Sequence, residues 1–502
     1  MISTGFFIGI DIGTSGSKAV LIDDRGVIQY EAELDYPLST PRPGWNEQDP
    51  ADWWNRSAEV LSSLTEIARS RGAEVRGVGL TGQMHSSVFL DKNDRVIRPA
   101  LLWNDTRTEA ECREIEERVG GVSRLIRLTS NLALEGFTAT KVLWLRNHEP
   151  EHYQRLRHLL VAKDYIRLQL TGERATEVSD ASGTLLFDVG RRAWSTEILE
   201  TLDLEPEIMP RCFESPEVTG HVSEAASKRT GLSAGTPVIG GGGDQAAGAV
   251  GNGVVRPGQI CISLGTSGVV FSPTAEHRPE PEGRIHTFCH TVPGRWHAMG
   301  VMLSAAGAYQ WFHDQLGGGD SFEELNKKAE SVLPGAGGVL FLPYLSGERT
   351  PHNDPHARGL FTGLSLSSGR GEMARAVIEG VSYGLHDCLE LIRGAGIEWD
   401  QALISGGGAR SDLWCQITAD VLGITISRLQ ENPGPAYGAA LLASVGSGVY
   451  SSVDEACEGH GQVERVFEPR KEYQNIYHEG YQRYRELYRR MREFFRETAK
   501  ST

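Results

Sequence analysis

The chain has 502 residues, of which 39% are hydrophobic and 23% charged, an ordinary composition for a globular protein of two to four domains. Its 50 Lys and Arg against 66 Asp and Glu leave a net charge of −16, which argues against a broad basic surface for nucleic acid or anionic membrane. The odd number of cysteines and the lack of any C-x-x-C pair suggest neither a disulfide framework nor a zinc site. We see no signal peptide and no apolar run near the roughly 20 residues of a membrane span, and we expect a cytoplasmic protein.

Two segments about half the chain apart share one pattern: a buried strand, a Gly-Thr-Ser-Gly turn and a second strand. The first comprises Phe7–Ile12, Gly13–Gly16 and Lys18–Ile22, and the second Gln259–Leu264, Gly265–Gly268 and Val269–Phe271. Chance is the alternative, because strand pairs joined by glycine are common. We predict two similarly built halves, which begin near residues 5 and 257.

Strands and helices alternate around these turns. We expect further strands, in chain order, at Gly26–Leu34, Val75–Leu80, Pro237–Ile239, Gly338–Leu342 and Ala402–Ile404. Helices are expected from Asp49-Pro50 onward, at Gln245–Val250, at Met373–Arg393 and, as an amphipathic helix, at Tyr473–Phe495. Glu residues are interleaved with the Arg residues of the last helix, which indicates a solvated face rather than a nucleic-acid surface. Polar groups of such α/β layers gather at strand ends, where we place the chemistry.

Four glycine-rich turns follow predicted strands, and each can present backbone N–H groups to an anion. They are Gly13–Gly16, Gly240–Gly243, Gly265–Gly268 and Gly406–Gly408. Together they suggest a polyphosphate held between the halves, although no P-loop motif exists. Gly241–Ala246 also fits a dinucleotide fingerprint, but the next thirty or so residues lack the acidic residue that a ribose requires, so we reject that interpretation.

Two carboxylates stand at these turns. Asp244 follows four glycines at a helix start, where it is either a helix cap or a general base for a hydroxyl that attacks a γ-phosphate. Asp11 ends an apolar strand, where a bound Mg²⁺ would offset the cost of burying its charge. The matching position of the second half is Ser263, and this asymmetry favours a functional role for Asp11.

The whole chain resembles the FGGY family of carbohydrate kinases. Gly359–Leu364 followed by Glu372–Glu379 fits the C-terminal signature of that family, and Trp45–Pro50 also fits its pattern. Within the family the motifs are most similar to those of kinases that act on D-xylulose. They are Gly82–His85, Leu102–Asp105, Gly136–Ala139, Lys163–Tyr165, Ser179–Gly183, Gly241–Gln245 and Leu345–His352.

The resemblance implies an α/β fold of two actin-like (ribonuclease-H-like) ATPase domains that flank a deep cleft. It implies residues 1–255 as the sugar domain with the catalytic base, 256–450 as the nucleotide domain, and 451–502 as an extension whose amphipathic helix packs on them. ATP and Mg²⁺ are the implied cofactors, and the implied reaction is phosphorylation of D-xylulose.

Residue roles carry over from the same resemblance. Asp244 is similar to the catalytic base, and Asp11 to the catalytic aspartate that organises Mg²⁺ and the phosphates. The implied sugar contacts are Met84, His85, Asn104, Asp105, Asp244 and Gln245, and the implied nucleotide contacts are Gly13, Thr14, Ser15, Lys18, Gly265, Thr266, Gly407, Gly408, Ala409 and Asp412.

Two positions depart from the family pattern. Asp412 stands where several relatives have Asn beside the adenine, and Thr140 stands where kinases of D-xylulose often have Pro.

Kinases of ribulose, gluconate or glycerol remain alternatives, although glycerol kinases have Arg-Glu where this chain has Met84-His85. An actin-like ATPase without a sugar substrate is an alternative from another class. The oligomeric state stays open, with a homodimer as one possibility.

Overall fold

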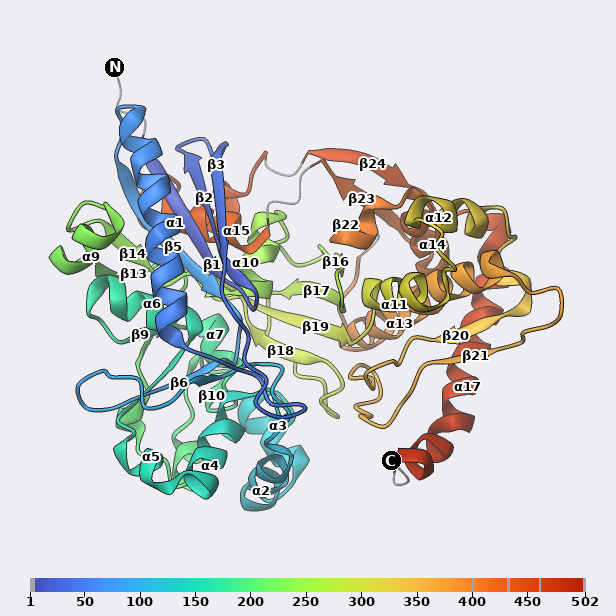
Figure 1. Cartoon of the computed structure of the whole chain (residues 1–502), viewed down its shortest axis with the longest axis horizontal. Helices are drawn as coiled ribbons and strands as arrows, with labels where there is room; N and C mark the ends of the chain where they lie inside the picture. Colours follow the sequence, from blue (N-terminus) through green and yellow to red (C-terminus); the bar gives the residue numbers. More distant parts are fainter. Residues whose placement is uncertain (1–4, 400, 431–433, 460–461, 500–502) are drawn as a thin grey trace.

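The computed structural model describes residues 5–399, 401–430, 434–459 and 462–499. Two large mixed sheets form the centres of the two halves, with the first half on the left of Figure 1 and the second on the right. The N-terminus and the C-terminus lie at opposite sides of the molecule (Figure 1). No helix in these ranges is both long and apolar enough to cross a membrane.

The first sheet has the strand order β13-β14-β5-β1-β2-β3, and β15 also pairs with β5. Its strands are β1 (Phe6–Ile12), β2 (Gly16–Asp23), β3 (Ile28–Asp35), β5 (Val75–Gly82), β13 (Val218–His221), β14 (Pro237–Ile239) and β15 (Gly242–Gly243). The second sheet has the order β18-β19-β17-β16-β22-β23-β24. Its strands are β16 (Cys261–Leu264), β17 (Gly268–Thr274), β18 (His286–Cys289), β19 (Trp296–Met302), β22 (Gln401–Ser405), β23 (Thr425–Leu429) and β24 (Val463–Phe467).

The two sheets are built alike. In each sheet the strand before the Gly-Thr-Ser-Gly turn pairs antiparallel with the strand after it and parallel with a later strand, so that β1 lies between β2 and β5 as β16 lies between β17 and β22. Asp11 lies opposite Thr81 of β5, and Ser263 lies opposite Ser405 of β22. The prediction of two similarly built halves is confirmed.

Most predicted elements are present, with shifted ends. Helix α1 (Pro50–Ser70) begins as expected, because the Asp49 carboxylate accepts a hydrogen bond from the Ala51 N–H and Pro50 occupies the first helical position. The strand predicted from Gly26 starts at Ile28, since Gly26 has a positive φ and the Val27 N–H is bound by Asp23 in a turn. The strand predicted from Gly338 starts at Leu340 (β20, Leu340–Leu342).

Two long helices cover the second domain. Helix α13 (Arg370–Gly394) starts three residues before the prediction, because the Glu372 carboxylate accepts the Gly369 N–H as a cap. Helix α17 (Gln474–Ala499) packs its buried tyrosines and Phe495 on the core of that domain. Near its end Phe494 is 54% exposed and Phe495 is buried, so the apolar side of the helix runs through Phe495.

Helices α10 (Asp244–Gly251) and α15 (Gly434–Gly446) cross between the domains at unusually close range. A Cβ on Gly438 would lie 1.8 Å from the Ala247 carbonyl oxygen, and a Cβ on Gly9 of β1 would lie 1.9 Å from that of Ala436. Helix α15 comes late in the chain, yet its apolar side belongs to the core of the first sheet (Figure 1). The second half of the chain therefore completes the core on one face of the first sheet.

Between β5 and β13 the chain forms a smaller subdomain. Its strands are β6 (Ser87–Leu90), β7 (Ala100–Leu101), β8 (His158–Val161), β9 (Ala175–Glu177), β10 (Phe187–Asp188), β11 (Ala193–Trp194) and β12 (Arg211–Phe213), and β4 (Glu47–Gln48) joins β7. Its helices are α2 (Glu109–Val119), α3 (Val122–Thr129), α4 (Thr138–His148), α5 (Pro150–Arg155), α7 (Val178–Ser182) and α8 (Thr196–Thr201). Helix α6 (Ala162–Thr171) lies in the same stretch of chain but packs its apolar side on the first sheet.

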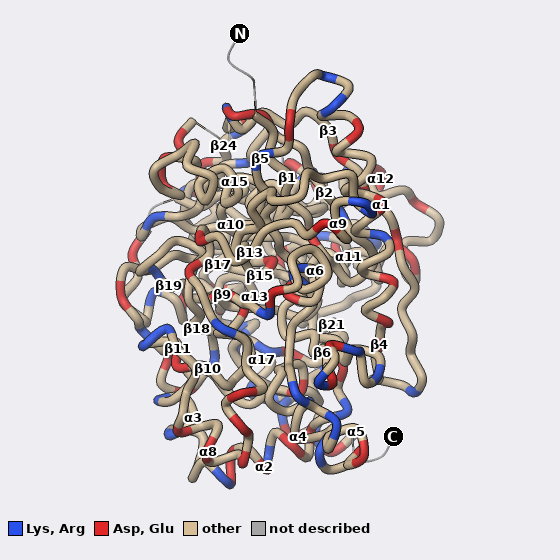
Figure 2. Tube along the Cα trace, turned by 90° about the vertical axis from the view of Figure 1, so that its left-hand side faces the viewer, with Lys and Arg blue, Asp and Glu red and all other residues tan. Residues whose placement is uncertain are grey.

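The remaining elements complete the layers. They are helix α9 (Glu224–Thr230) in the first domain, and α11 (Ala306–Leu316), α12 (Phe322–Glu330), α14 (Asp412–Leu422), α16 (Val453–Ala456) and strand β21 (Leu360–Thr362) in the second half of the chain. Seen from the side of the first domain, acidic and basic residues are interspersed along the chain rather than separated into blocks (Figure 2).

Candidate active site

The chemistry-bearing residues of the first half meet at the C-terminal ends of three adjacent strands. Thr81 of β5 lies between Asp11 of β1 on one side and Gly242 of β15 on the other. Asp244 follows β15 directly as the first residue of α10, and the helix cap is Gly243. Asp244 is therefore the first helical residue rather than the cap, and its Oδ1 accepts the N–H of Gln245 in the first turn.

The glycines before Asp244 lie where neighbouring atoms leave no room for a side chain. A Cβ on Gly241, which has a φ of +74°, would lie 1.7 Å from the Leu80 carbonyl oxygen. A Cβ on Gly243 would lie 2.9 Å from the Met84 sulfur. The loop can pass this close to β5 and to Met84 only without side chains, and this close passage delivers Asp244 to the strand ends.

Burial raises the pKa of both carboxylates, and the charge of Asp244 adds to the rise at Asp11. Burial raises the pKa of Asp244 to about 6, while hydrogen bonds from Gln245 oppose the rise. Burial, followed by the charge of Asp244, raises the pKa of Asp11 to about 7, against the opposing charge of Lys18. A hydrogen bond of 2.7 Å from the Gln245 N–H orients Asp244 Oδ1.

Asp11 also fits a cation. Its Oδ1 is buried without a hydrogen-bond partner, and a second carboxylate close enough to raise its pKa adds negative charge. No cluster of three or more His, Cys, Asp or Glu among the described residues could hold a metal by itself. Mg²⁺ commonly binds one or two carboxylates together with substrate phosphates and water, so this site is of the expected kind.

Met84 and His85 follow β5 at the same edge. The His85 backbone has a φ of +65°, and its carbonyl oxygen accepts hydrogen bonds from Lys141 Nζ (2.9 Å) and Thr138 Oγ1 (3.2 Å), which hold this unusual conformation. The ring stacks on Phe137 with centroids 4.4 Å apart.

The tautomer of His85 follows from its partner. Nδ1 lies 2.5 Å from the carbonyl oxygen of Gly183, which can only accept, so Nδ1 carries the hydrogen and Nε2 has a lone pair. Burial, assisted by the charge of Lys141, lowers the pKa of His85 to about 3, so the ring is neutral near pH 7. Nε2 can therefore accept a hydrogen bond from a hydroxyl.

The first Gly-Thr-Ser-Gly turn is held by side chains. Tyr36 and Gln83 donate to the Gly13 carbonyl, and Trp103 Nε1 donates to Thr14 Oγ1 at 2.9 Å. Since Trp103 occupies an acceptor site of the hydroxyl, Thr14 can direct its own O–H to an anion. Ser15 is exposed on the turn.

Lys18, another predicted nucleotide contact, forms an ion pair with Glu31 at 2.9 Å. The matching turn of the second half is supported from behind, since the Gly265 and Thr266 carbonyls accept the N–H groups at the start of α11.

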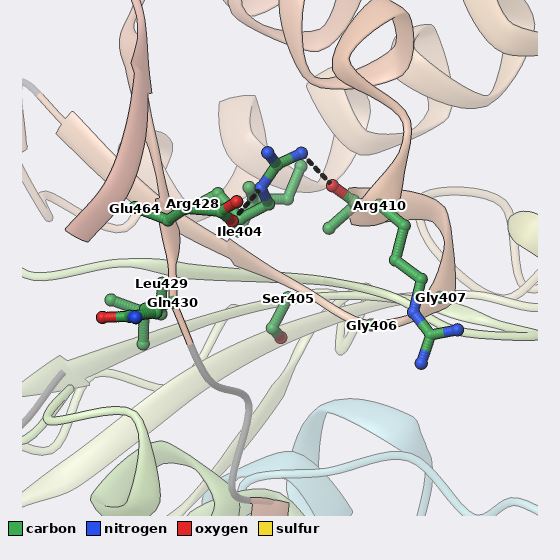
Figure 3. Close-up of a pocket in the computed structure, with 10 residues that line it drawn as sticks. Ile404, Ser405, Gly406, Gly407, Arg410, Arg428, Leu429, Gln430 and Glu464 are labelled. Atoms are coloured by element: carbon green, nitrogen blue, oxygen red, sulfur yellow. Dashed lines mark hydrogen bonds and ion pairs between the residues drawn. The ribbon is translucent and has the colours of Figure 1, made fainter. Parts of the chain in front are cut away.

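A cavity of about 480 Å³ opens beside the turn after β22 (Figure 3). Its wall includes the predicted nucleotide residues Gly407 and Ala409, and Gly408 lies between them. The Arg428 guanidinium closes one side, where it donates to the Ala409 carbonyl at 3.0 Å and pairs with Glu464 at 2.8 Å (Figure 3). The sequence motifs did not point to Arg428, Glu464 or Arg410, because they come from other elements or carry no motif of their own.

Asp412 does not line this cavity. Its carboxylate pairs with Arg428 at 2.8 Å and with Arg465, and it lines a separate pocket of about 270 Å³. Its predicted contact with the adenine stays a prediction. In the structure Asp412 contacts the cavity only through Arg428.

The remaining predicted sugar contacts differ in their availability. Asn104 Oδ1 is buried without a hydrogen-bond partner, so it is available to a ligand. The Asp105 carboxylate already accepts a two-nitrogen contact from Arg107 and the Asn46 N–H at 2.7 Å. Asp105 thus holds the loop of Asn104 in place, and its direct contact with a sugar remains a prediction, as does that of Gln245.

Two sheets of one topology, each with a Gly-Thr-Ser-Gly turn, and half-buried carboxylates at the strand ends of the first sheet define a phosphotransferase of the actin-like ATPase class. The chain belongs to the FGGY family of carbohydrate kinases: the N-terminal domain of that family matches residues 6–251 and its C-terminal domain matches residues 260–447. The recognised family and the fold predicted from the sequence are confirmed.

Several relatives cover most of the chain. Xylulose kinase of Escherichia coli is 43% identical over 450 residues, which are 89% of this chain and 92% of that protein. Xylulose kinase of Bacillus subtilis is 38% identical over 94% of this chain and 96% of its own length. The crystal structure of a xyloylose kinase from Brucella ovis superposes with a TM-score of 0.92 at 38% identity, covering 97% of this chain and 100% of its own.

Proposed function

We propose that this protein transfers the γ-phosphoryl group of ATP to D-xylulose and releases D-xylulose 5-phosphate and ADP. Relatives over most of the chain are xylulose kinases. The observation that carries the proposal is the meeting of Asp11, Asp244 and Met84-His85 at one edge of the first sheet.

Asp244 acts as the general base in this proposal. Its carboxylate accepts the proton of the sugar hydroxyl as that oxygen attacks the γ-phosphorus. A pKa of about 6 leaves Asp244 ionised at neutral pH, yet makes it more basic than an ordinary carboxylate. The proton moves from the hydroxyl to Asp244, and the γ-phosphoryl group moves from ATP to the sugar oxygen, so that ADP leaves with the bridging oxygen.

The turns hold the phosphates. The Gly13 N–H donates to the Gly16 carbonyl, so in this proposal the turns bind the phosphate oxygens through the N–H groups of their central residues and the hydroxyls of Thr14 and Thr266. The cavity beside Ala409 takes the adenosine. Asp11 would hold Mg²⁺, which when bound would neutralise charge on the phosphates. The predicted domain boundaries, cytoplasmic location and homodimer stay predictions.

His85 recognises the sugar through a hydrogen bond. With Nδ1 bound to Gly183, its neutral Nε2 accepts a hydrogen bond from a sugar hydroxyl, while the Met84 side chain covers an apolar edge of the open-chain ketose. A site that hydrogen-bonds a particular hydroxyl discriminates against a substrate in which that hydroxyl points elsewhere, because the polar groups of the site are then left without partners. We therefore expect a preference for D-xylulose over its C3 epimer D-ribulose.

Steady-state kinetics with coupled ADP release test this function. We expect sugar-dependent ADP release, a higher kcat/KM for D-xylulose than for D-ribulose, and a loss of about 1–3 kcal/mol in transition-state binding for His85→Ala. The variant His148→Ala, which removes an exposed histidine stacked on Trp144 in the same domain, is the control. Equal kcat/KM for the two epimers, or ADP release without a sugar, would refute the assignment.

A further inference from the structure

Helix α7 (Val178–Ser182) touches both halves of the sugar site. At its start, Ser179 Oγ accepts the Gly243 N–H at 3.0 Å, one residue before Asp244. At its end, the Gly183 carbonyl accepts His85 Nδ1 at 2.5 Å. One short helix therefore fixes the loop of the proposed base and the ring of the proposed sugar contact.

Buried charges anchor this helix. The Glu177 carboxylate caps α7, since it accepts the N–H groups of Ser179 and Asp180, both at 2.8 Å, and the hydroxyls of Ser179 (2.9 Å) and Ser215 (2.7 Å). Lys163 Nζ lies 3.5 Å from Glu177 and 3.3 Å from Asp180. All of these side chains are buried.

The same cluster holds the entry of the glycine loop. Arg167 donates from one nitrogen to the Ile239 carbonyl at 2.8 Å and from another to the Gly240 carbonyl at 2.7 Å. Arg167 and Lys163 share Asp164, at 3.3 and 2.8 Å. Arg167 thus holds the start of the glycine loop, and Ser179 holds its end, one residue before Asp244.

The cluster contains two cations and three carboxylates in a region without solvent access. Burying such charges costs more than packing apolar side chains of similar size, so stability alone does not explain them. What these side chains add is fixed geometry, because the Ile239 and Gly240 carbonyls and the Gly243 N–H each have a defined side-chain partner.

We infer that α7 is the positioning element of the active site, and that Ser179, with Glu177 and Arg167 behind it, holds Asp244 at its working distance from the sugar. This rests on the role proposed for Asp244. Ser179 and Arg167 are positioning residues, since neither is placed against the substrate.

A double-mutant cycle tests the inference. Ser179→Ala removes the acceptor of the Gly243 N–H, and we expect kcat with D-xylulose to fall about 10- to 100-fold, the range for a misplaced reacting group. In the Asp244→Asn background the same change is expected to cost less than about threefold, because Ser179 acts through the missing base. Single-turnover phosphorylation, normalised to sugar-binding sites counted by tryptophan fluorescence, gives the four rates.

Ser382→Ala is the matched control, since Ser382 is an equally buried serine that donates to the Ile378 carbonyl in the second domain. We expect it to have the same small effect in both backgrounds. If Ser179→Ala does not fold, Arg167→Lys replaces it, because it keeps the charge but can serve only one of the two carbonyls well.

Equal loss from Ser179→Ala in both backgrounds, or loss only in proportion to the missing binding sites, would overturn the inference and leave α7 a structural element. Failure of the proposed function appears differently, as a wild-type protein that does not phosphorylate D-xylulose or an Asp244→Asn variant with normal turnover.

Discussion

Asp244 and Asp11 share one edge of the first sheet and are suited to different tasks. Asp244 is oriented by the Gln245 N–H at the start of α10, and Asp11 keeps a buried oxygen without a partner. Two titratable groups in unlike environments are a common way for a site to separate base and charge-holding roles. Their assignment rests on this difference.

Asp244→Asn keeps the shape of the side chain and removes the base. We expect kcat to fall about 10²–10⁴-fold while the protein folds and still binds D-xylulose. Sugar binding by calorimetry and turnover by coupled ADP release provide the two measurements, with the exposed Asp203→Asn as control. Turnover close to that of the wild type would exclude Asp244 as the base.

The dependence of wild-type activity on pH also tests the role of Asp244. Only the ionised form of Asp244 accepts a proton, and its pKa is raised to about 6, so the activity that depends on it falls as the pH drops through 6. Saturating Mg²⁺ is used, because Asp11, whose pKa is raised to about 7, also has to be ionised to hold the cation. An ordinary carboxylate would keep full activity down to about pH 4. We expect kcat/KM to decrease about tenfold per pH unit below 6, and a flat profile down to pH 5 would contradict the assignment.

Asp11→Ala tests the proposed cation site. We expect kcat to fall about 10²–10³-fold, the usual cost of a lost electrostatic contact to the reacting group, and half-maximal activity to require more Mg²⁺. D-xylulose affinity should change little, because Asp11 is not a proposed sugar contact. Titration of Mg²⁺ at fixed ATP checks this, and an unchanged Mg²⁺ requirement with normal turnover would show that Asp11 is structural.

At the scale of elements, the crossing of α10 and α15 depends on missing side chains. The Cβ of an alanine at Gly438 would lie 1.8 Å from the Ala247 carbonyl oxygen, which is backbone and cannot rotate away. At Gly248 on the facing helix, the nearest atom would be a Pro435 carbon at 3.7 Å, an ordinary contact. The two glycines of this interface thus differ: Gly248 has space for a methyl group and Gly438 has none.

We expect Gly438→Ala to lower the free energy of unfolding by about 1–3 kcal/mol, because the helices must move apart. Gly248→Ala, the matched control, should be neutral or stabilising by up to about 1 kcal/mol, since alanine favours the helix. Thermal and urea unfolding of both variants checks the pair. Equal stability of the two variants would mean that this crossing is looser than the structure shows.

At the scale of the molecule, the two halves are not independent. The first sheet buries Phe7, Val20 and Ile22 against Ala440 and Leu441 of α15, which belongs to the second half. A chain ending before α15 would expose this apolar surface to water. Such exposure favours aggregation over folding.

The fragment of residues 1–255 is therefore expected not to fold by itself, although it contains the whole first sheet. We expect weak cooperativity on heating and strong binding of a hydrophobic dye, whereas the full chain should unfold in one main transition. Calorimetry of both checks this. A fragment with its own sharp transition would show that α15 is dispensable for the first domain.

The sequence by itself determined the paired halves, their Gly-Thr-Ser-Gly turns and the placement of Asp11 and Asp244 beside those turns. These features are local: apolar strands, glycines where the backbone must turn tightly, and carboxylates at strand ends are visible in a few consecutive residues. The alternation of strands and helices followed for the same reason, with ends displaced by caps and turns such as those at Gly26 and Glu372.

Only the tertiary structure decided which partners these residues have. The bond of His85 to Gly183, the support of Gly243 by Ser179 and the turning of Asp412 toward Arg428 join residues far apart in the chain. The same holds for α15, which follows the second sheet in sequence but packs on the first. Such contacts depend on how complete elements pack, and a local pattern carries no information about the distant surface against which it will lie.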